Sequence, residues 1–365
     1  MQEELSAVMS RFATVGLFTH AERIDTGHIN QTFRVVTGGE QGRGEYLLQR
    51  INTTIFPDPA GLMANIATVT QHIAEQLGRQ NVADLERRVL RIVPTREGEL
   101  YATDAAAGCW RLYIFIGETH PLDDRPSLAE IYQAGLGFGT FLAQLIDLPA
   151  ATISESIPYF HNGSRRLAAF IAALSQDVAE RVEDVGPEIE FILRHQKILT
   201  QPETLLDSGE LPLRITHNDT KSNNILLDNH TGEALAVVDL DLVMPGLTLY
   251  DLGDLVRTSS TGVAEDEPNI ERIVVQEDHL RAAVEGFLAG AGPLLTDRER
   301  ESLPLGPPYM ALIMATRFLT DYLSGDIYYR IHHPEHNLQR ARAQIALTEQ
   351  LLKKRSLLDQ IVAAS

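Results

Sequence analysis

The stretch from Arg214 to Pro245 constrains the fold of this chain most, because two short apolar runs there flank a set of turn residues. Residues 228–233 contain the Asp, Asn and Gly that favour a turn, and the runs on either side suit strands. The pattern predicts a β-hairpin with strands at residues 224–227 and 234–238. Since a hairpin returns the end of its second strand to the start of its first, we expect Asp239 to lie beside Asn224.

Polar residues occupy fixed positions around this hairpin. His217, Asp219 and Asn224 form the pattern H-x-D-x-x-x-x-N, with which a kinase catalytic loop places a base and, five residues later, a magnesium ligand. Mg²⁺ prefers one or two carboxylate or amide oxygens with phosphate oxygens and water, so Asn224 and Asp239 are the predicted metal ligands. Asp219 is the predicted catalytic base, which would orient and deprotonate the acceptor hydroxyl. Ordinary turn formation is the alternative, but it does not account for these four residues in this order.

The charge of the whole chain limits its partners. Its 365 residues carry a formal net charge of -19, with a pI near 5.0. Nucleic acid and anionic membranes require a basic surface, so neither is an expected partner. ATP is also an anion, and it must therefore be met locally by Mg²⁺ and a few cations.

The cysteine content, and the lack of a secretion signal or a membrane-spanning segment, both indicate the cytoplasm. The single cysteine, Cys109, excludes an intramolecular disulfide framework, fits a reducing cytosol and is expected to serve packing. The first residues, MQEELSAVMSRF, lack the basic flank and long apolar core of a secretion signal. No run approaches the roughly 18 apolar residues of a membrane span. We therefore expect a soluble, cytoplasmic protein.

A segment near the N-terminus is the first candidate for nucleotide contact. Residues 24–36 form a polar turn around Gly27 and then a strand with alternating apolar residues. Glycine lets the backbone approach phosphates closely, although no G-x-G-x-x-G occurs here. An ordinary hairpin tip is the alternative. Together with the downstream catalytic loop, the segment makes Gly27, His28 and Asn30 candidates for binding the nucleotide.

The next strand, residues 45–51, departs from the usual kinase pattern. Kinases carry here a lysine that holds the α- and β-phosphates, whereas this chain has Gln49 with Arg50 beside it. Successive strand residues point to opposite faces, so only one of the two can face the nucleotide, and Gln49 is the predicted one. Which group replaces the lysine stays open.

One long helix and further strands complete the N-terminal part. Asp58 followed by Pro59 predicts a helix start, and the apolar residues that follow are spaced as one helix face. Strands are expected at residues 89–93, 99–101 and 110–116. The segment from Phe115 to Glu118 is the predicted hinge between two lobes, where the backbone would bind adenine, so Phe115 and Glu118 are predicted nucleotide-binding residues.

Helical patterns dominate from Ser127 onwards. Ser127 with Glu130, and Thr296 with Glu299, form capping boxes that predict helix starts. Glycines in the first of these helices each cost on the order of 1 kcal/mol relative to alanine, a cost that close packing against a neighbour would offset. They are Gly135, Gly137 and Gly139. Other helices are expected at residues 165–174, 187–199, 280–287 and 307–323.

Residues after the hairpin are candidates for positioning or binding the acceptor. Asp251 is expected to brace the catalytic loop, and Asp254 and Arg257 to face either the substrate or each other. Arg317 precedes SGDIYYRIHHPEHN, whose polar aromatic and charged groups can bind sugar hydroxyls or stack on a pyranose ring. A structural ion pair for Arg317 and buried positions for the two tyrosines are the alternative, and these residues alone do not decide.

Two sets of motifs resemble known families. ITHNDTKSNNILL followed by VVDLD is similar to the aminoglycoside and choline phosphotransferase superfamily, which has a bilobal protein-kinase-like fold. A resemblance to the N-acetylhexosamine 1-kinases of that superfamily is carried by blocks spread over residues 25–338, namely DTGHINQTF, NTTIFPD, WRLYIFI, THNDTKSNNIL, DLDLVMPG, RFLTDYLSGDIYY and PEHNL. That family uses MgATP to phosphorylate the anomeric C1 hydroxyl of N-acetylglucosamine or N-acetylgalactosamine.

The resemblance implies roles for individual residues. Asp219 would be the base at the acceptor hydroxyl, with Asn224 and Asp239 near Mg²⁺. His28 would belong to the nucleotide loop. The residues implied at the sugar are Arg317 and Tyr328.

We therefore expect an α+β chain with a bilobal protein-kinase-like fold. Residues 1–117 would form a nucleotide-binding lobe with a small antiparallel sheet and one long helix. Residues 118–365 would form a larger, mainly helical lobe that holds the catalytic loop and the acceptor. Two alternatives stay open: a kinase for another small hydroxylated acceptor, such as an aminoglycoside, choline or a different sugar, and a silent nucleotide-binding protein, which the missing lysine motivates.

Overall fold

The computed structural model describes residues 2–24, 29–40, 42–122 and 125–364. The chain divides into two compact units, and each unit consists of several separate stretches of the sequence. The first, here called the sheet unit, consists of Met1–Thr119, Ala151–Pro158 and Leu235–Met244. The second, the helical unit, consists of His120–Ala150, Tyr159–Ala234 and Pro245–Ser365.

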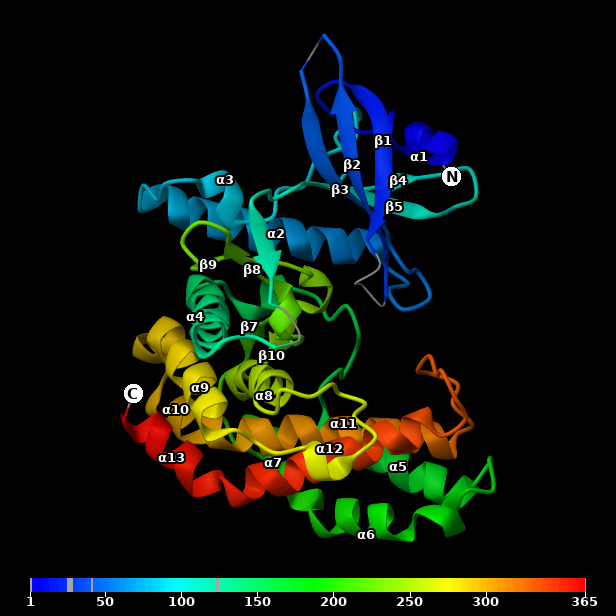
Figure 1. Cartoon of the computed structure of the whole chain (residues 1–365), viewed down its shortest axis with the longest axis vertical. Coiled ribbons are helices and arrows are strands. Elements are labelled where there is room, and N and C mark those ends of the chain that lie inside the picture. The colour runs from blue at the N-terminus through cyan, green and yellow to red at the C-terminus, as the bar shows by residue number, and fades with distance from the viewer. Residues whose placement is uncertain (1, 25–28, 41, 123–124, 365) are drawn as a thin grey trace. The chain divides into compact units, whose positions relative to one another are not determined.

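The sheet unit is built on a five-stranded antiparallel sheet with the strand order β1-β2-β3-β5-β4 (Figure 1). Its strands are β1 (Leu17–Ile24), β2 (Gln31–Gly38), β3 (Gly44–Arg50), β5 (Cys109–Ile114) and β4 (Ala102–Thr103). The register between β3 and β5 pairs Leu48 with Leu112 and Gln49 with Arg111. Because side chains alternate between faces, these two pairs lie on opposite sides of the sheet.

One face of this sheet holds the hydrophobic core of the unit. Phe33, Val35, Leu48 and Leu112 pack there against apolar residues of the N-terminal helix α1 (Gln2–Met9). The strand alternation that buries these residues sends their neighbours in sequence to the other face. That second face carries polar and charged side chains, including a fully buried arginine that is described below.

The predicted long helix is confirmed as α2 (Pro59–Arg79). The side chain of Asp58 accepts a hydrogen bond from the backbone N–H of Gly61, and Pro59 occupies the first turn, where its missing N–H leaves no bond unmade. The apolar stripe from Leu62 to Leu77 is buried. A short helix, α3 (Leu85–Arg88), follows.

Several expected elements differ in the structure. The expected strands at residues 89–93 and 99–101 are wrong: only isolated bridges join Phe12 to Thr95 and Ile92 to Tyr113. Pro94 lies within this stretch and has no N–H to donate, which interrupts a ladder. The single helix expected at 187–199 is two, α6 (Gly186–Arg194) and α7 (Gln196–Asp207).

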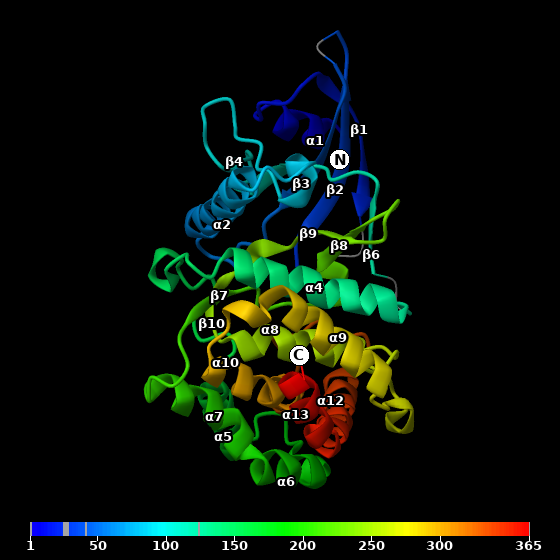
Figure 2. The same ribbon diagram turned by 90° about the vertical axis from the view of Figure 1, so that its left-hand side faces the viewer.

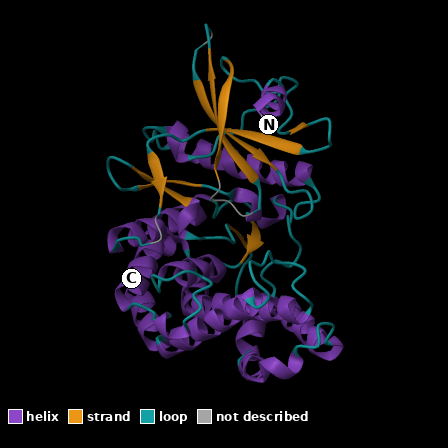
Figure 3. Cartoon of the chain, turned by 45° about the vertical axis from the view of Figure 1, so that its right-hand side comes forward, coloured by secondary structure: helices purple, strands orange, loops and turns teal. Residues whose placement is uncertain are grey.

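Helices make up most of the helical unit (Figure 3). In addition to α6 and α7 they are α4 (Leu128–Gln144), α5 (Gly163–Gln176), α8 (Thr248–Ser259), α9 (Glu277–Ala291), α10 (Asp297–Ser302), α11 (Gly306–Leu323), α12 (His336–Lys353) and α13 (Arg355–Ala364). Both expected capping boxes are present, at the starts of α4 and α10. The helix α11 is buried along nearly its whole length and packs against α12 (Figure 1).

The predicted hairpin is present as β8 (Ile225–Asp228) and β9 (Ala234–Val237), which belong with β6 (Thr119–Pro121) to a sheet of order β6-β8-β9. Its turn is closed by backbone hydrogen bonds of 2.8–2.9 Å that join Asp228 to Gly232 and to Glu233. A further pair of strands, β7 (Arg214–Thr216) and β10 (Met244–Gly246), flanks it in sequence. The boundary between the two units falls within β9 and β10.

Helices α4 and α9 lie side by side in close contact (Figure 2), and their glycines explain why. A Cβ atom added to Gly135 would come within 2.5 Å of the Ala283 carbonyl oxygen, and one at Gly139 within 2.2 Å of the Phe287 carbonyl oxygen. These glycines let the two helix backbones approach each other. The expected offset for their poor helix propensity is thereby confirmed for this pair.

Substituting alanine for Gly139 should lower the free energy of unfolding by about 1–3 kcal/mol, because the added methyl group meets backbone atoms that cannot move without separating the helices. The matched control is Gly78→Ala in α2, where no atom lies within 4 Å of the new Cβ atom. That control should stabilise the protein by up to about 1 kcal/mol. Chemical denaturation of both variants checks the prediction, and equal stability changes would contradict it.

Within the part of the chain that the structure describes, no helix is both long and apolar enough to cross a bilayer.

Candidate active site

The catalytic loop lies in the helical unit, between β7 and β8. Lys221 places its Nζ atom 2.9 Å from Oδ1 of Asp219. The Nδ2 atom of Asn224, at the end of a short 3-10 turn, donates to Oδ2 of Asp219 at 3.1 Å and to its backbone oxygen at 2.9 Å. The predicted base and the predicted metal ligand are therefore brought together, with a lysine on the opposite side of the carboxylate.

The two bonds of Asn224 fix the orientation of its amide group. Both bonds use Nδ2, so the Oδ1 oxygen points the other way. An amide oxygen of this kind is a ligand that Mg²⁺ accepts. Among the described residues no group of three or more His, Cys, Asp or Glu gathers as a metal cluster. Mg²⁺ does not need such a cluster, because it is commonly held by one or two protein oxygens and keeps several waters.

The charge state of Asp219 is set by its neighbours. Burial by itself would raise the pKa of Asp219, but the ammonium group of Lys221, with smaller effects of His217 and Arg257, holds the pKa below its ordinary value. The carboxylate in turn raises the pKa of Lys221. Asp219 is consequently ionised at neutral pH, with 18% of its side chain exposed.

Asp251 braces the catalytic loop, as expected from the sequence. Its two carboxylate oxygens accept hydrogen bonds from the backbone N–H groups of His217 at 2.9 Å and Asn218 at 2.8 Å. Its own backbone oxygen accepts from the hydroxyl of Thr220 at 2.6 Å. Burial raises the pKa of Asp251 to about 7 from an ordinary 3.8, against the two N–H donors, which lower it.

Asp251→Asn should lower the free energy of unfolding by about 1–3 kcal/mol, because an amide NH₂ then faces a backbone N–H that needs an acceptor. A carboxyl whose pKa is higher in the folded state holds its proton more tightly there. Its contribution to stability is therefore full below about pH 3.8 and is lost as the pH rises through about 7.

The asparagine cannot titrate in this range. Urea denaturation should therefore show the stability difference between wild type and Asp251→Asn shrinking from about pH 5 to about pH 7. A difference that widens over that range would contradict the account.

His161 supports the same loop from a distant part of the sequence. Its Nε2 atom lies 2.9 Å from the backbone oxygen of Asn218 and must donate, because a carbonyl oxygen only accepts. Burial lowers the pKa of His161 to about 3, so the ring is neutral. Asn218 itself has a positive φ of 62°, which bends the chain immediately before Asp219.

A group of charges packs behind the loop. Nε of Arg257 lies 2.7 Å from Oδ1 of Asp254, and Nη1 of Arg257 bonds Glu265. Asp254 and Arg257 thus face each other, which was one of the two possibilities that the sequence left open. The charges of this group act on the pKa values of Asp219 and Lys221.

The implied acceptor residues also gather in the helical unit. The guanidinium carbon of Arg317 lies 5.0 Å from the ring centre of Phe160, 5.5 Å from that of Tyr329 and 6.0 Å from that of Tyr328. We call these four residues the Arg317 cluster. Over the described residues Arg317 forms no ion pair with a carboxylate, so its alternative interpretation as a structural ion pair is wrong. Tyr328 is 60% exposed, so its interpretation as a buried residue is also wrong.

His161 connects this cluster to the catalytic loop. Its ring centre lies 4.4 Å from that of Phe160 in the cluster, and its Nε2 atom donates to the backbone oxygen of Asn218, the residue before Asp219. Arg317 belongs to α11, and Tyr328 and Tyr329 belong to the loop that follows this helix (Figure 1). His161 thus contacts both the Arg317 cluster and the residue next to Asp219 within one unit.

In the sheet unit, the polar face of the sheet holds Arg111, whose side chain is 1% exposed. Nε of Arg111 donates to Oε1 of Gln49 at 3.0 Å, and Nη1 bonds Oδ1 of Asp241. Nδ2 of Asn30 donates to the other carboxylate oxygen of Asp241 at 2.7 Å. The charge of Asp239 also acts on Arg111, and this residue has a left-handed backbone with φ of 59°.

The predicted nucleotide residues have the following positions. Gly27 and His28 lie outside the described residues. Gln49 donates to the hydroxyl of Thr32 at 3.1 Å and accepts from Arg111. The backbone N–H of Phe115 donates to the Glu45 oxygen at 3.0 Å, and the Glu118 oxygen accepts from Arg87 at 3.2 Å. Their roles in nucleotide binding stay predictions.

Residues of these networks that were missed from the sequence include Lys221, His161, Arg111 and Asp241. Two of them left a signal: Lys221 stands two residues after Asp219, and Arg111 is a lone charge inside the apolar strand WRLYIFI. A charged residue in the interior of a buried strand requires a partner, which could have marked it.

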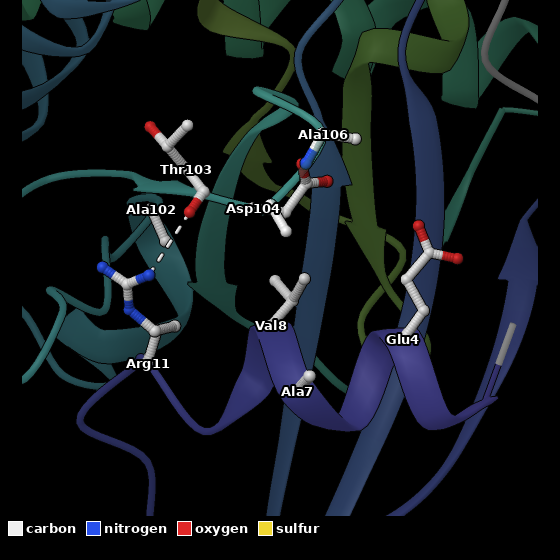
Figure 4. Close-up of a pocket in the computed structure, with 9 residues that line it drawn as sticks. Glu4, Ala7, Val8, Arg11, Ala102, Thr103, Asp104 and Ala106 are labelled. Carbon is white, nitrogen blue, oxygen red and sulfur yellow. Dashed lines mark hydrogen bonds between the residues drawn. The ribbon is translucent and has the colours of Figure 1, made fainter.

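A cavity of about 390 Å³ lies in the sheet unit between α1 and the turn after β4 (Figure 4). Glu4, Arg11 and Asp104 contribute its charged lining, and Nη1 of Arg11 donates to the Thr103 oxygen at 3.3 Å. Alanine and valine side chains supply much of the rest. It contains none of the predicted site residues.

Solved structures of phosphotransferases share this fold. An aminoglycoside phosphotransferase from Alicyclobacillus acidocaldarius matches with a TM-score of 0.62 and 12% identity, over 98% of this chain and 96% of that one. A spectinomycin phosphotransferase in complex with ADP and spectinomycin matches with 0.57 and 13%, over 96% and 99%. A choline/ethanolamine kinase family protein from Mesorhizobium loti matches with 0.54 and 17%, over 100% and 99%. The expected α+β, kinase-like fold class is thereby confirmed.

The sequence itself matches a family model, described as the phosphotransferase enzyme family, over residues 20–292. The match includes the catalytic loop, the hairpin, Arg111 and Asp251, and ends before Arg317. It covers well over half of the chain. This chain therefore belongs to the phosphotransferase enzyme family and is a phosphotransferase.

Proposed function

We propose that this chain is an ATP-dependent kinase that phosphorylates the anomeric C1 hydroxyl of N-acetylhexosamines, N-acetylglucosamine or N-acetylgalactosamine, to give the sugar 1-phosphate. One observation carries the proposal. The ionised carboxylate of Asp219 is held by Lys221 and Asn224, and His161 contacts both Asn218, the residue before Asp219, and Phe160 of the Arg317 cluster. Reactive carboxylate and sugar-binding candidates thus belong to one small region of the helical unit.

The chemistry of Asp219 follows from its charge. The C1 oxygen forms a bond to the γ-phosphorus as the bond from that phosphorus to the β–γ bridging oxygen breaks, and ADP leaves. The hydroxyl proton passes to Asp219. Because its pKa is held low, Asp219 is a weak base, and its main contribution is to orient the hydroxyl. A loose transition state does not require a strong base, because the hydroxyl proton becomes acidic only as the new bond to phosphorus forms.

Mg²⁺ is the proposed metal ion, and the oxygen atoms of the catalytic segment support it. Asn224, with its Oδ1 oxygen turned away from Asp219, and Asp239, at the end of the hairpin, are the proposed ligands. When bound, the ion would neutralise charge on the phosphates. The spectinomycin phosphotransferase of similar fold holds ADP, which supports ATP as the donor here. The residues proposed on the nucleotide side are Gly27, His28, Asn30, Gln49, Phe115 and Glu118.

The Arg317 cluster favours a neutral sugar over a cationic acceptor. A guanidinium among aromatic rings and without a carboxylate partner repels an ammonium group, whereas it can donate hydrogen bonds to an acetamido carbonyl and to hydroxyls. Asp254 and Glu265 could attract a cation, but Arg257 already pairs with both. An aminoglycoside or choline is therefore the second candidate, favoured only by the net charge of -19.

An acceptor panel with coupled detection of ADP tests the proposal. N-acetylglucosamine and glucosamine form a matched pair that differs by an acetyl group and one positive charge. We expect kcat/KM to be at least about tenfold higher for the acetylated sugar. Higher activity with glucosamine, choline or an aminoglycoside would overturn the sugar assignment and leave the family assignment in place.

Arg317→Met should raise KM for N-acetylglucosamine by about tenfold or more with a smaller change in kcat, because it removes ground-state binding to the acceptor. Arg355→Met is the control, since Arg355 forms an exposed pair with Asp359 on α13 and should change neither constant. Initial rates over a sugar titration provide both values. An unchanged KM in Arg317→Met would remove Arg317 from the acceptor site.

A further inference from the structure

The polar face of the sheet in the sheet unit contains an ion pair that no part of the proposed chemistry uses. Arg111 stands in the centre of β5 with 1% of its side chain exposed, and its partner Asp241 is 4% exposed. Its guanidinium also lies over the ring of Tyr113, 5.4 Å from the ring centre. A fully buried charge pair contributes little net stability, so its presence calls for another explanation.

The position of Arg111 in the sheet suggests that explanation. Kinases carry a lysine on the strand that corresponds to β3, and Gln49 occupies the place here. The register sets Arg111 of β5 directly opposite Gln49, on the same face. Gln49 cannot supply a charge, but it orients one, because its Oε1 accepts from Nε of Arg111. The cation missing from β3 is present one strand away.

Asp241 is held by three separate stretches of the sheet unit. Arg111 and Asn30 bond its two carboxylate oxygens, and the hydroxyl of Ser156 donates to its backbone oxygen at 2.8 Å. Asn30 is itself fixed, since its Oδ1 accepts from the backbone N–H of Asn52 at 3.0 Å. Asp241 sits inside the 3-10 turn Leu240–Leu242, which starts directly after Asp239.

We propose that Arg111 is a positioning residue for the metal site: by anchoring Asp241, it sets the turn that presents the carboxylate of Asp239 to Mg²⁺ and the nucleotide phosphates. This inference rests on the proposed function, in which Asp239 is a metal ligand. Asp239 has a left-handed backbone, which costs free energy in a residue with a Cβ atom and is retained where the surrounding structure holds it. Asp241, which Arg111 anchors two residues later, holds Asp239 in this conformation. Arg111 also offsets the negative charge of the Asp239 and Asp241 carboxylates.

The alternative is that Arg111 serves only folding. Arg111→Met by itself does not distinguish the two, because it leaves Asp241 buried and unpaired. The double variant Arg111→Met with Asp241→Asn removes both charges together and keeps the volume similar. The matched control is Arg342→Met, which breaks the partly buried Arg342–Glu188 pair of the helical unit, between α12 and α6 and outside the segment that contains Asp239.

The experiment measures ADP binding by calorimetry with and without Mg²⁺, together with thermal unfolding, on wild type and variants. In wild type Mg²⁺ should strengthen ADP binding. In the double variant this gain in ADP affinity from Mg²⁺ should fall by about 10-fold to 100-fold, which is the usual effect of removing a group that orients a metal ligand. Binding of ADP without Mg²⁺ should change by less than about threefold. Arg342→Met should lose stability and keep the full gain in ADP affinity from Mg²⁺.

An unchanged gain in a folded double variant overturns the role of Arg111 and leaves the proposed function intact. No gain from Mg²⁺ in wild type overturns the metal site and this inference with it. If the double variant does not fold, Arg111→Lys decides, because it keeps the charge and loses the bond from Nε to Gln49. In Arg111→Lys the increase in ADP affinity that Mg²⁺ causes should be at least about threefold smaller than in wild type. An unchanged increase would again overturn the proposal.

Discussion

Asp219→Asn should lower kcat by about 10³-fold with little change in the affinity for nucleotide. The asparagine cannot accept the hydroxyl proton, and its amide must turn an NH₂ group towards either Lys221 or Asn224, which both donate to this side chain in the wild type. Orientation of the acceptor is lost together with the base. Initial rates from coupled ADP release, and calorimetric titration with ADP, measure the two quantities.

The control for this variant is Asp207→Asn, which makes the same change at an exposed carboxylate in the last turn of α7. It should leave kcat and nucleotide affinity unchanged. Turnover of Asp219→Asn close to that of wild type would remove Asp219 from its role, and a parallel loss of nucleotide binding would make the residue structural.

Asp239→Asn should have the second large effect. Replacing a charged ligand by a neutral amide weakens Mg²⁺ binding, so the Mg²⁺ concentration for half-maximal rate should rise and kcat/KM should fall by at least about 100-fold. Rates measured over a Mg²⁺ titration at fixed ATP separate weaker Mg²⁺ binding from a lower rate at saturating Mg²⁺. Part of the lost rate should return at high Mg²⁺.

Asp278→Asn, at an exposed position in the first turn of α9, is the matched control for Asp239→Asn and should titrate with Mg²⁺ as wild type does. A Mg²⁺ dependence of Asp239→Asn that coincides with wild type would assign the ligand to another residue and would leave the order of residues around the hairpin without its proposed meaning.

Local signals in the sequence predicted the parts of the site that are close together in the chain. Asp219 and Asn224 are five residues apart, and the loop between them is short enough for spacing to imply contact. The start of α2 and the two capping boxes were predictable for the same reason, since each depends on residues within one helical turn. Asp251 was found in the segment YDLGDLVR, the next polar run after the hairpin.

Contacts between distant residues could not be predicted from spacing. His161 reaches the oxygen of Asn218 across 57 positions, and Arg111 reaches Asp241 across 130. Tertiary packing alone decides such pairs. The absence of a lysine on β3 raised the possibility of a silent protein, whereas the structure supplies a buried cation on the neighbouring strand.

The net charge of the whole chain, -19, differs in sign from the charge of several side chains next to the loop that contains Asp219. Lys221, Arg257 and Arg317 stand close to or behind the catalytic loop, although acidic residues outnumber basic ones in the chain as a whole. An anionic transition state is stabilised by cations within a few ångströms, while distant surface charges are screened by salt. The net charge therefore does not oppose phosphoryl transfer at this loop.

The most direct test of the central claim is ³¹P NMR of a reaction that contains the purified protein, MgATP and N-acetylglucosamine. The account predicts that ADP appears together with a new phosphomonoester resonance that couples to the anomeric proton, and that neither forms with Asp219→Asn. ADP accompanied only by inorganic phosphate, or a product that forms equally well without the Asp219 carboxylate, would contradict it.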